Sequence, residues 1–321
     1  MARVIAELCQ NHLGDPAILA DMVAAAASAG ADYAKIQAIR VRELTRRERF
    51  EEGRVEGGVV RCIRRPYQAE YDRLRPLELS PDAELRFREE AVARGIRPLT
   101  SVFTRAAVPD IVAQGYDEVK VPSYDCASLP LLREVAVSFS HVWVSTGATQ
   151  DDEIAAAAEA LRTTSFSFLH CVTIYPTPLT AMNLARIAWL RRFAPSVGFS
   201  DHSLFSRDGL WASLYALALG ADVIERHFTI LPPQRTRDGP VSVDPGGLAE
   251  LCRWAKAPRE EVERHVREVV PEDVRGTMLG VPARTLTDEE RLNRDYYRGR
   301  FASRVGADFV YNWEERPLEG R

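Results

Sequence analysis

Residues 196–228, SVGFSDHSLFSRDGLWASLYALALGADVIERHF, contain a complete strand–helix–strand unit. The apolar run 196–200 predicts a strand, the stretch 209–219 predicts a helix that ends at Gly220, and 222–228 predicts a second strand. A strand that returns to its sheet through a helix lies parallel to the first strand. This unit therefore predicts an α/β fold with a parallel sheet.

The same alternation extends over most of the 321 residues. Further strands are expected at 3–8, 32–38, 96–102, 118–122, 142–145 and 166–172. Helices are expected from Asp15-Pro16 to Gly30, from Ser80-Pro81 to Gly95, at 106–114, from about 129, and at 151–162, 184–193 and 247–269. Eight strands that alternate with helices predict a closed (β/α)8 (TIM) barrel. The alternative, a doubly wound sheet, needs a glycine-rich loop after the first strand, and residues 9–14, CQNHLG, do not provide one.

One stretch breaks this rhythm. Residues 39–80 are rich in Arg and Glu and contain Gly57-Gly58 and Pro66, which predicts an insertion after the second strand. We therefore expect a catalytic barrel domain at 1–269 and a short C-terminal extension at 270–321.

Composition excludes several classes of protein. Hydrophobic residues make up 46% and charged residues 27%, as in ordinary globular proteins. A net charge of −4 without long basic runs argues against nucleic acid as a partner. The chain shows neither an apolar run long enough for a membrane span nor a signal peptide, and its five cysteines have no paired spacing. These features predict a cytoplasmic protein with reduced thiols and no membrane association.

Polar side chains lie at the carboxyl end of nearly every expected strand, where barrel enzymes build their active sites. They are Glu7, Asn11, His12, Lys35, Gln37, Ser101, Lys120, Ser123, Asp125, Ser145, Thr146, Thr173, Tyr175, Ser200, Asp201, His202, Glu225 and His227. Packing does not explain so many polar groups at one end of a barrel, so we expect the active site there.

Lysine is rare in this chain, since only three of its 42 basic residues are lysines. Lys35 and Lys120 lie in apolar strands, whereas Lys256 is expected to be solvated on a helix. A lysine in an apolar strand can bind an anion or form a Schiff base, and we favour anion binding. Three hydroxyls can assist with a phosphate or, alternatively, cap local turns: Ser123, Ser145 and Ser200.

His202 and His227 end neighbouring strands and predict a divalent metal site with positions open for water and substrate, supported by the nearby acids Asp201 and Glu225. A hydrogen-bonded histidine at a strand end is the alternative. Glu7 is expected to transfer protons or orient water, with a structural carboxylate as the alternative. Three cysteines near this end are expected to pack as small hydrophobic side chains: Cys9, Cys126 and Cys171. The residues thus predict metal-dependent chemistry on an anionic metabolite without naming the reaction.

Motifs in the same strands resemble the sialic acid synthase family, which includes N-acetylneuraminate, pseudaminate and legionaminate synthases. They run in order from about residue 4 to 245: IAE at 5–7 with Asn11-His12 and Gly14, GADYAKIQ at 30–37, FTRAA at 103–107 before KVPS at 120–123, STG at 145–147, LHC at 169–171, YPTP at 175–178, GFSDH at 198–202 and IERHFT at 224–229. The resemblance implies a transferase that condenses phosphoenolpyruvate with a sugar aldehyde and releases phosphate. It also suggests a homodimer.

The resemblance assigns roles to individual residues. It places a divalent ion, Mn²⁺ first with Mg²⁺ or Co²⁺ as alternatives, on His202 and His227. It places Lys35 near phosphoenolpyruvate, and it implies that Glu7 handles the water molecule or a proton. It assigns the phosphate to Lys120, Ser123, Ser145 and Ser200. It assigns the sugar to Gln37, Asp125, Tyr175 and Asp238.

Parts of the chain depart from the family pattern. Family members usually carry a C-terminal antifreeze-like domain, which residues 270–321 do not resemble. Thr173 stands where the family often has a phosphate-contacting Asn, and Asp238-Gly239-Pro240 replaces another family motif. The phosphoenolpyruvate half of the site is thus nearly complete and the sugar half is altered, which predicts an unusual acceptor that is not N-acylated. A metal-dependent aldolase or lyase, or a catalytically silent pathway partner, are the alternatives.

Overall fold

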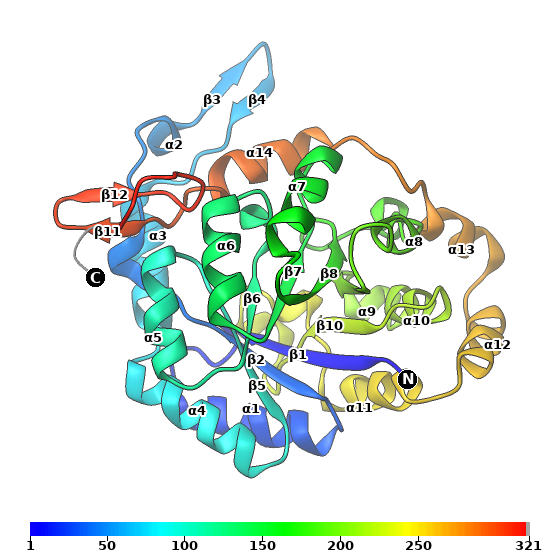
Figure 1. Ribbon diagram of the computed structural model, residues 1–321. Helices are drawn as coiled ribbons and strands as arrows, with labels where there is room; N and C mark the ends of the chain where they lie inside the picture. The colour runs from blue at the N-terminus through cyan, green and yellow to red at the C-terminus, as the bar shows by residue number, and fades with distance from the viewer. Residues whose placement is uncertain (319–321) are drawn as a thin grey trace.

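The computed structural model describes residues 1–318, in which eight parallel strands close into a barrel in the order β1-β10-β9-β8-β7-β6-β5-β2 (Figure 1). The predicted TIM barrel is therefore confirmed. Its strands are β1 (Arg3–Cys9), β2 (Tyr33–Gln37), β5 (Arg97–Ser101), β6 (Glu118–Val121), β7 (His141–Ser145), β8 (Ser165–Cys171), β9 (Ser196–Asp201) and β10 (Val223–His227). Each end lies within one residue of its predicted position.

Helices cover the outside of the barrel (Figure 1): α1 (Pro16–Ser28), α4 (Pro81–Ala93), α5 (Val108–Ala113), α6 (Leu129–Ser138), α7 (Asp151–Leu161), α8 (Arg186–Leu190), α10 (Trp211–Ala218) and α11 (Pro245–Ala255). Helix α1 begins as predicted, because the Asp15 side chain accepts from the Ala17 amide and proline takes the first position. The single helix predicted at 247–269 is wrong. Pro258 separates α11 from α12 (Arg259–Val269), since proline disfavours a helical residue before it.

The barrel interior has two levels. Its amino-terminal half is filled by a buried cluster of Ile5, Tyr33, Leu99, Trp143, Leu169 and Val223. Below them, Glu118 accepts hydrogen bonds from the Tyr33 hydroxyl and the Trp143 indole. Side chains alternate along a strand, so the next inward positions towards the carboxyl ends carry Glu7, Lys35 and Ser101. The apolar cluster therefore forms the floor of the candidate site.

The insertion at 39–80 contains α2 (Arg49–Glu52), α3 (Tyr67–Leu74) and a hairpin of β3 (Arg54–Glu56) and β4 (Val59–Cys62) that protrudes from the barrel (Figure 1). The C-terminal residues form α13 (Glu272–Leu279), α14 (Asp288–Tyr297) and a hairpin of β11 (Ser303–Val305) and β12 (Asp308–Val310). The two regions contact each other, because Arg47 donates to the carbonyls of Asp295, Tyr296 and Arg298.

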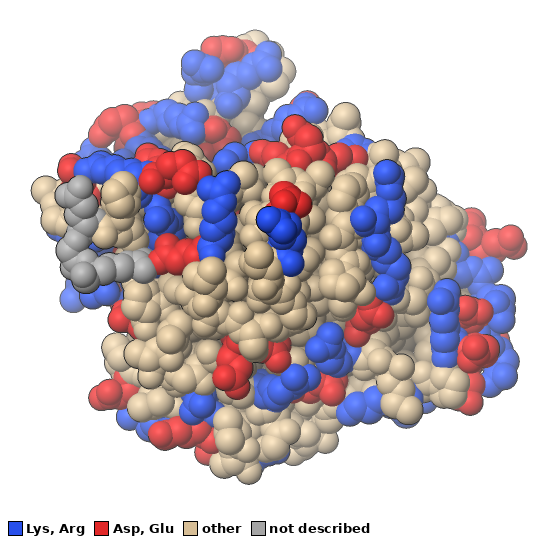
Figure 2. Space-filling model, in the orientation of Figure 1, with Lys and Arg blue, Asp and Glu red and all other residues tan. Residues whose placement is uncertain are grey.

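Short α9 (Phe205–Asp208) and several single turns complete the described structure. Basic and acidic side chains are interspersed on the face drawn in Figure 2. Within residues 1–318, no helix has the length and apolar character that a membrane span requires.

Candidate active site

A cavity of about 320 Å³ opens at the carboxyl ends of the barrel strands. Most of the predicted site residues line it: Glu7, Lys35, Gln37, Lys120, Ser123, Ser145, Tyr175, Ser200, His202, His227 and Asp238. They come from seven of the eight barrel strands and the loops that follow them. The barrel thus brings together residues that lie up to 231 positions apart in the sequence.

Four buried charges meet at the base of this cavity. Lys35 contacts Glu7, and its Nζ lies 3.4 Å from Glu225 Oε2. Lys120 Nζ lies 3.1 Å from Glu225 Oε1. All four side chains are at most 8% exposed. The two lysines and the two carboxylates are therefore paired where solvent does not reach them, and burial lowers the pKa of Lys35 to about 7.

Glu225 is the link between the two lysines. Burial alone would raise the pKa of Glu225, but Lys120 and Lys35 outweigh it and hold that pKa well below its ordinary value. The Ser200 hydroxyl donates to the same carboxylate over 2.7 Å. The sequence led us to expect Glu225 beside the metal histidines. In the structure its carboxylate instead occupies the position between the two lysines.

The two candidate metal histidines are neighbours. The ring centroids of His202 and His227 lie 5.2 Å apart, and the Tyr175 ring lies 4.1 Å from that of His202. Burial lowers the pKa of both histidines to about 3, which keeps them neutral at neutral pH. Asp201, expected to support them, points the other way and pairs with Arg226 at 2.6 Å, because successive strand residues face opposite sides.

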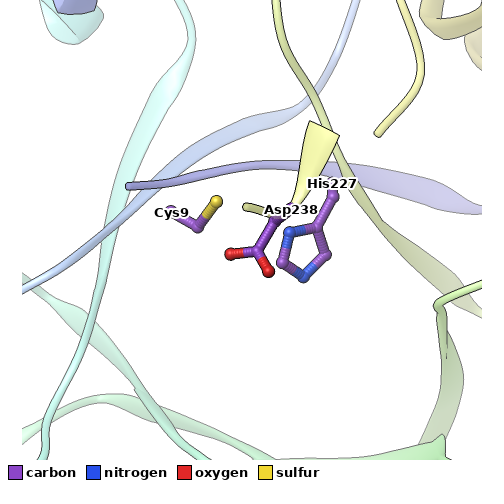
Figure 3. Close-up of side chains that lie close together, drawn as sticks. All are labelled: Cys9, His227 and Asp238. Carbon is purple, nitrogen blue, oxygen red and sulfur yellow. The ribbon is translucent and has the colours of Figure 1, made fainter. Parts of the chain in front are cut away.

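Cys9 lies beside two of the cavity residues, and it is fully buried, as expected of a small hydrophobic residue. Cys9 Sγ, a ring nitrogen of His227 and a carboxylate oxygen of Asp238 all lie within 4.8 Å of one another. Figure 3 shows these three side chains facing one another, with the Asp238 carboxylate between the sulfur and the ring in this view. Thiol, imidazole and carboxylate are all ligands of divalent transition metals, so this group fits such an ion.

The turn after β7 forms another wall of the cavity. Ser145 Oγ is buried and has no hydrogen-bond partner among residues 1–318. Ser123 Oγ lies 3.5 Å from Cys171 Sγ. A side chain at Gly147 would have its Cβ only 2.7 Å from Thr173 Cγ2 and 2.9 Å from Ser123 Oγ, so glycine is needed for this packing. A buried hydroxyl without a partner is the kind of group that a ligand satisfies.

Two predicted site residues lie behind the cavity wall. Asp125 Oδ1 accepts from Ser128 Oγ and Asn312 Nδ2, each at 2.9 Å, and burial raises the pKa of this carboxyl to about 6. Thr173 is fully buried, and its carbonyl accepts from Asn293 Nδ2 at 2.9 Å. Their contacts are with the protein, and their predicted contacts with a sugar or phosphate stay predictions.

The cavity mouth contains residues that the sequence did not indicate. The insertion contributes Arg65 and Arg73, and the loop after β10 contributes Arg237. Helix α14 and the segment after it contribute Glu289, Asn293, Tyr297 and Arg300. Glu70 pairs with Arg73 at 2.9 Å and Arg300 at 3.4 Å. Tyr297 stacks on Tyr124 with ring centroids 4.9 Å apart. No local motif marks these residues, because tertiary packing brings them to the mouth.

Comparison with known proteins matches residues 22–266 to the NeuB family. The N,N'-diacetyllegionaminic acid synthase of Campylobacter jejuni is 29% identical over 78% of this chain and 74% of its own length. The pseudaminic acid synthase of the same organism is 30% identical over 75% of this chain and 69% of its own length.

A solved structure extends the similarity over more of the chain. The N-acetylneuraminic acid synthetase of Leptospira borgpetersenii, determined in complex with citrate, is 25% identical, with a TM-score of 0.69. The alignment covers 92% of this chain and 90% of that one. The match to the NeuB family at residues 22–266 spans most of the barrel and contains most of the cavity-lining residues, whereas Glu7 and the residues of α14 lie outside it. The chain belongs to the NeuB family.

Proposed function

We propose that this protein condenses phosphoenolpyruvate with a sugar aldehyde to give a 2-keto-3-deoxy acid and inorganic phosphate. The observation that carries the proposal is the cavity itself, in which buried Lys35 and Lys120 lie on one side and neutral His202 and His227 on another. Relatives named as legionaminic and pseudaminic acid synthases support a synthase-type enzyme.

The donor substrate would bind at the lysines. Phosphoenolpyruvate carries a phosphate and a carboxylate, and Lys35 and Lys120 offer two amino groups within reach of one carboxylate, Glu225. Hydrogen bonds that involve a charged group are stronger than those between neutral groups. Hydroxyls on the cavity walls add uncharged donors: Ser123, Ser145 and Ser200. The unpaired Ser145 hydroxyl supports this assignment.

The predicted metal would bind at the opposite side. His202 and His227 are neutral, and His227 Nδ1 is buried without a hydrogen-bond partner among the described residues, which suits a divalent cation. Mn²⁺ is the ion that the family resemblance implies, with Mg²⁺ or Co²⁺ as alternatives. When bound, such an ion supplies Lewis acidity that polarises the aldehyde carbonyl.

The reaction needs one water molecule and one base. The enol carbon of phosphoenolpyruvate forms a bond to the aldehyde carbon, and water adds to the resulting cationic carbon. The aldehyde oxygen takes up a proton as the carbon–carbon bond forms, and the proton that the water loses balances it. The C–O bond to phosphate then breaks, and phosphate leaves with the electron pair and the proton of the added hydroxyl. Glu7 would accept a proton from the water, since its Oε1 is fixed by the Cys9 amide at 2.7 Å and its other oxygen contacts Lys35.

The acceptor would extend towards the cavity mouth, past Gln37, Tyr175 and Asp238. Arg65 and Arg237 also line the mouth, and neither forms an ion pair with another described residue. Unpaired guanidinium groups suit phosphate or carboxylate substituents. The sugars tested should therefore include aldose phosphates and uronates besides N-acyl and neutral aldoses.

The test is phosphate release from phosphoenolpyruvate by metal-stripped protein with added Mn²⁺ and a panel of such sugars. Release that requires both one sugar and the metal is the expected result, and Lys120→Met should suppress it. A new carbon–carbon bond formed from pyruvate without phosphate would favour the aldolase alternative. Failure to bind phosphoenolpyruvate would contradict the proposal.

A further inference from the structure

We infer that Cys9, His227 and Asp238 are ligands of one divalent cation, next to His202, and that the thiolate makes this site prefer Zn²⁺, Co²⁺ or Fe²⁺ to Mg²⁺ and Mn²⁺. The inference deepens the proposed function, because it assigns ligands to the metal proposed there and changes its expected identity. Its test uses no substrate, so it can fail while the proposed reaction stands.

The geometry brings three donor types together from three separate segments. Cys9 ends β1, His227 ends β10, and Asp238 lies in the loop after β10. Their donor atoms lie within 4.8 Å of one another (Figure 3). Metal–ligand bonds of about 2.0–2.3 Å in a tetrahedral site place donor atoms roughly 3.3–3.8 Å apart. Rotations of the side chains by small amounts would therefore close this group around an ion.

The backbone directs Cys9 into the barrel. The β1–β2 pairing shifts register between Glu7 and Cys9, and Cys9 has a φ of 40°. A left-handed conformation costs about 1–2 kcal/mol for a residue other than glycine. The Cys9 amide donates to Glu7 Oε1 at 2.7 Å, which fixes this bend. The position of the thiol is thus held by the local structure at an energetic cost.

Asn11 holds the Asp238 loop against the end of β1. Asn11 Nδ2 donates to the Phe228 carbonyl at 2.9 Å and to Ser242 Oγ at 3.0 Å. The Ser242 hydroxyl in turn donates to the Asp238 carbonyl at 2.7 Å. These bonds connect the segments that carry all three donors. Asn11 is therefore a positioning residue for the site.

An independent observation points to a ligand. His227 is 6% exposed, and its Nδ1 has no hydrogen-bond partner within residues 1–318. Buried polar nitrogen atoms in folded proteins nearly always have a partner. A cation bound between the ring, the thiolate and the carboxylate would give this histidine a partner through its ring.

The thiol determines which ions fit. Thiolate is a soft ligand that favours Zn²⁺ and similar ions, whereas Mg²⁺ and Mn²⁺ favour oxygen ligands. Cys171 is the competing candidate, because its Sγ lies 3.8 Å from His202 Nδ1. Any test must therefore distinguish Cys9 from Cys171.

The first experiment is an anaerobic titration of metal-free, reduced protein with Co²⁺, followed in the near ultraviolet. A thiolate-to-cobalt charge-transfer band is expected in the wild type, in Cys171→Ser and in the control Cys252→Ser. Cys252 is buried on α11, away from the cavity lining. Cys9→Ser should lose the band, and its Co²⁺ affinity should fall at least about 10- to 100-fold. A band that persists in Cys9→Ser, or that only Cys171→Ser abolishes, overturns the inference.

A second measurement needs no variant. X-ray absorption of the zinc-loaded wild type should contain one sulfur neighbour at about 2.3 Å. A shell of nitrogen and oxygen alone overturns the inference, and it leaves the proposed function standing if phosphate release is intact. A sulfur-containing site in a protein that releases no phosphate has the opposite meaning: the ligand assignment holds and the proposed reaction fails.

Discussion

Replacing Glu225 with Gln tests whether its carboxylate occupies the anion site. The carboxylate lies 3.1 Å from Lys120 and 3.4 Å from Lys35, and it is almost fully buried. Breaking a buried ion pair by removing one partner costs about 3–5 kcal/mol. Gln keeps the shape and an acceptor for Ser200, and Lys35 keeps Glu7 as a partner. We therefore expect the free energy of unfolding to fall by about 3 kcal/mol, the lower end of that range.

The same substitution should strengthen anion binding. On the proposed function, inorganic phosphate must displace Glu225 from Lys120 in the wild type, whereas Glu225→Gln leaves Lys120 without this carboxylate partner. One charge-assisted hydrogen bond contributes about 1.5–3 kcal/mol, so phosphate should bind roughly 10- to 100-fold more tightly. Because a ligand of the native state stabilises it in proportion to ln(1 + [L]/Kd), phosphate should restore most of the lost stability.

Urea unfolding at constant ionic strength, with and without phosphate, measures both effects. Glu84→Gln is the matched control, since Glu84 is equally buried and pairs with Arg40 at 2.6 Å on α4, away from the cavity lining. It should lose stability without any gain in phosphate binding. If phosphate stabilised Glu225→Gln no more than the wild type, or stabilised both variants equally, Glu225 would not compete with anions.

Three other substitutions test separate parts of the site. Lys120→Met should raise the KM for phosphoenolpyruvate about 10- to 100-fold through loss of one charged hydrogen bond. The control Lys256→Met should leave the KM unchanged, because the exposed Lys256 Nζ donates to the Gly30 carbonyl and Lys256 does not line the cavity. Asp125→Asn should flatten the pH dependence of stability, because burial raises the pKa of Asp125 to about 6 and the wild type therefore loses up to about 3 kcal/mol as pH rises from 4 through 6. Urea midpoints measured across that pH range test this, and a variant whose midpoint depends on pH as the wild type's does would contradict it. Gly147→Ala should lower the thermal midpoint and weaken phosphoenolpyruvate binding, because its Cβ would lie 2.7 Å from Thr173 Cγ2; calorimetry showing normal binding would contradict this.

The sequence was sufficient for the barrel because its signals are local. Strand segments such as 142–145 are continuous apolar runs that end at a polar residue, and the helices between them begin at residues such as Asp15-Pro16. Eight such strand–helix units leave few arrangements in which all the strands pair in parallel, and a closed barrel is one of them. Pro258 is a local signal for the split between α11 and α12, and it outweighs the periodicity that predicts one helix at 247–269.

The positions of the site residues were predictable, but their partners were not. Knowing that strands run in parallel places Lys35, Lys120, His202 and His227 at one end of the barrel. Which charges pair there depends on the register between strands that are distant in sequence. Alternation along β9 would have excluded Asp201 from the cavity, since its neighbours Ser200 and His202 face inward.

Cys9 shows why the metal side of the site was incomplete from sequence. Residue type and an apolar neighbourhood predict a small buried side chain there, and Cys9 is indeed fully buried. Alternation from Ile5 and Glu7 places Cys9 on the inner face of β1. Only the three-dimensional structure shows that His227 and Asp238 lie beside it.

The end of β1 links the two halves of the site. Glu7 contacts Lys35 in the proposed donor half, and its Oε1 accepts from the Cys9 amide, whose side chain lies beside His227 and Asp238 in the proposed metal half. The same carboxylate therefore fixes the bend that directs Cys9 inward. A change at Glu7 would disturb both halves together, so loss of activity in a Glu7 variant cannot by itself establish that Glu7 transfers a proton. Cobalt binding by Glu7→Gln separates the two roles: a retained charge-transfer band with lost turnover indicates proton transfer, and loss of both indicates that Glu7 acts by positioning Cys9.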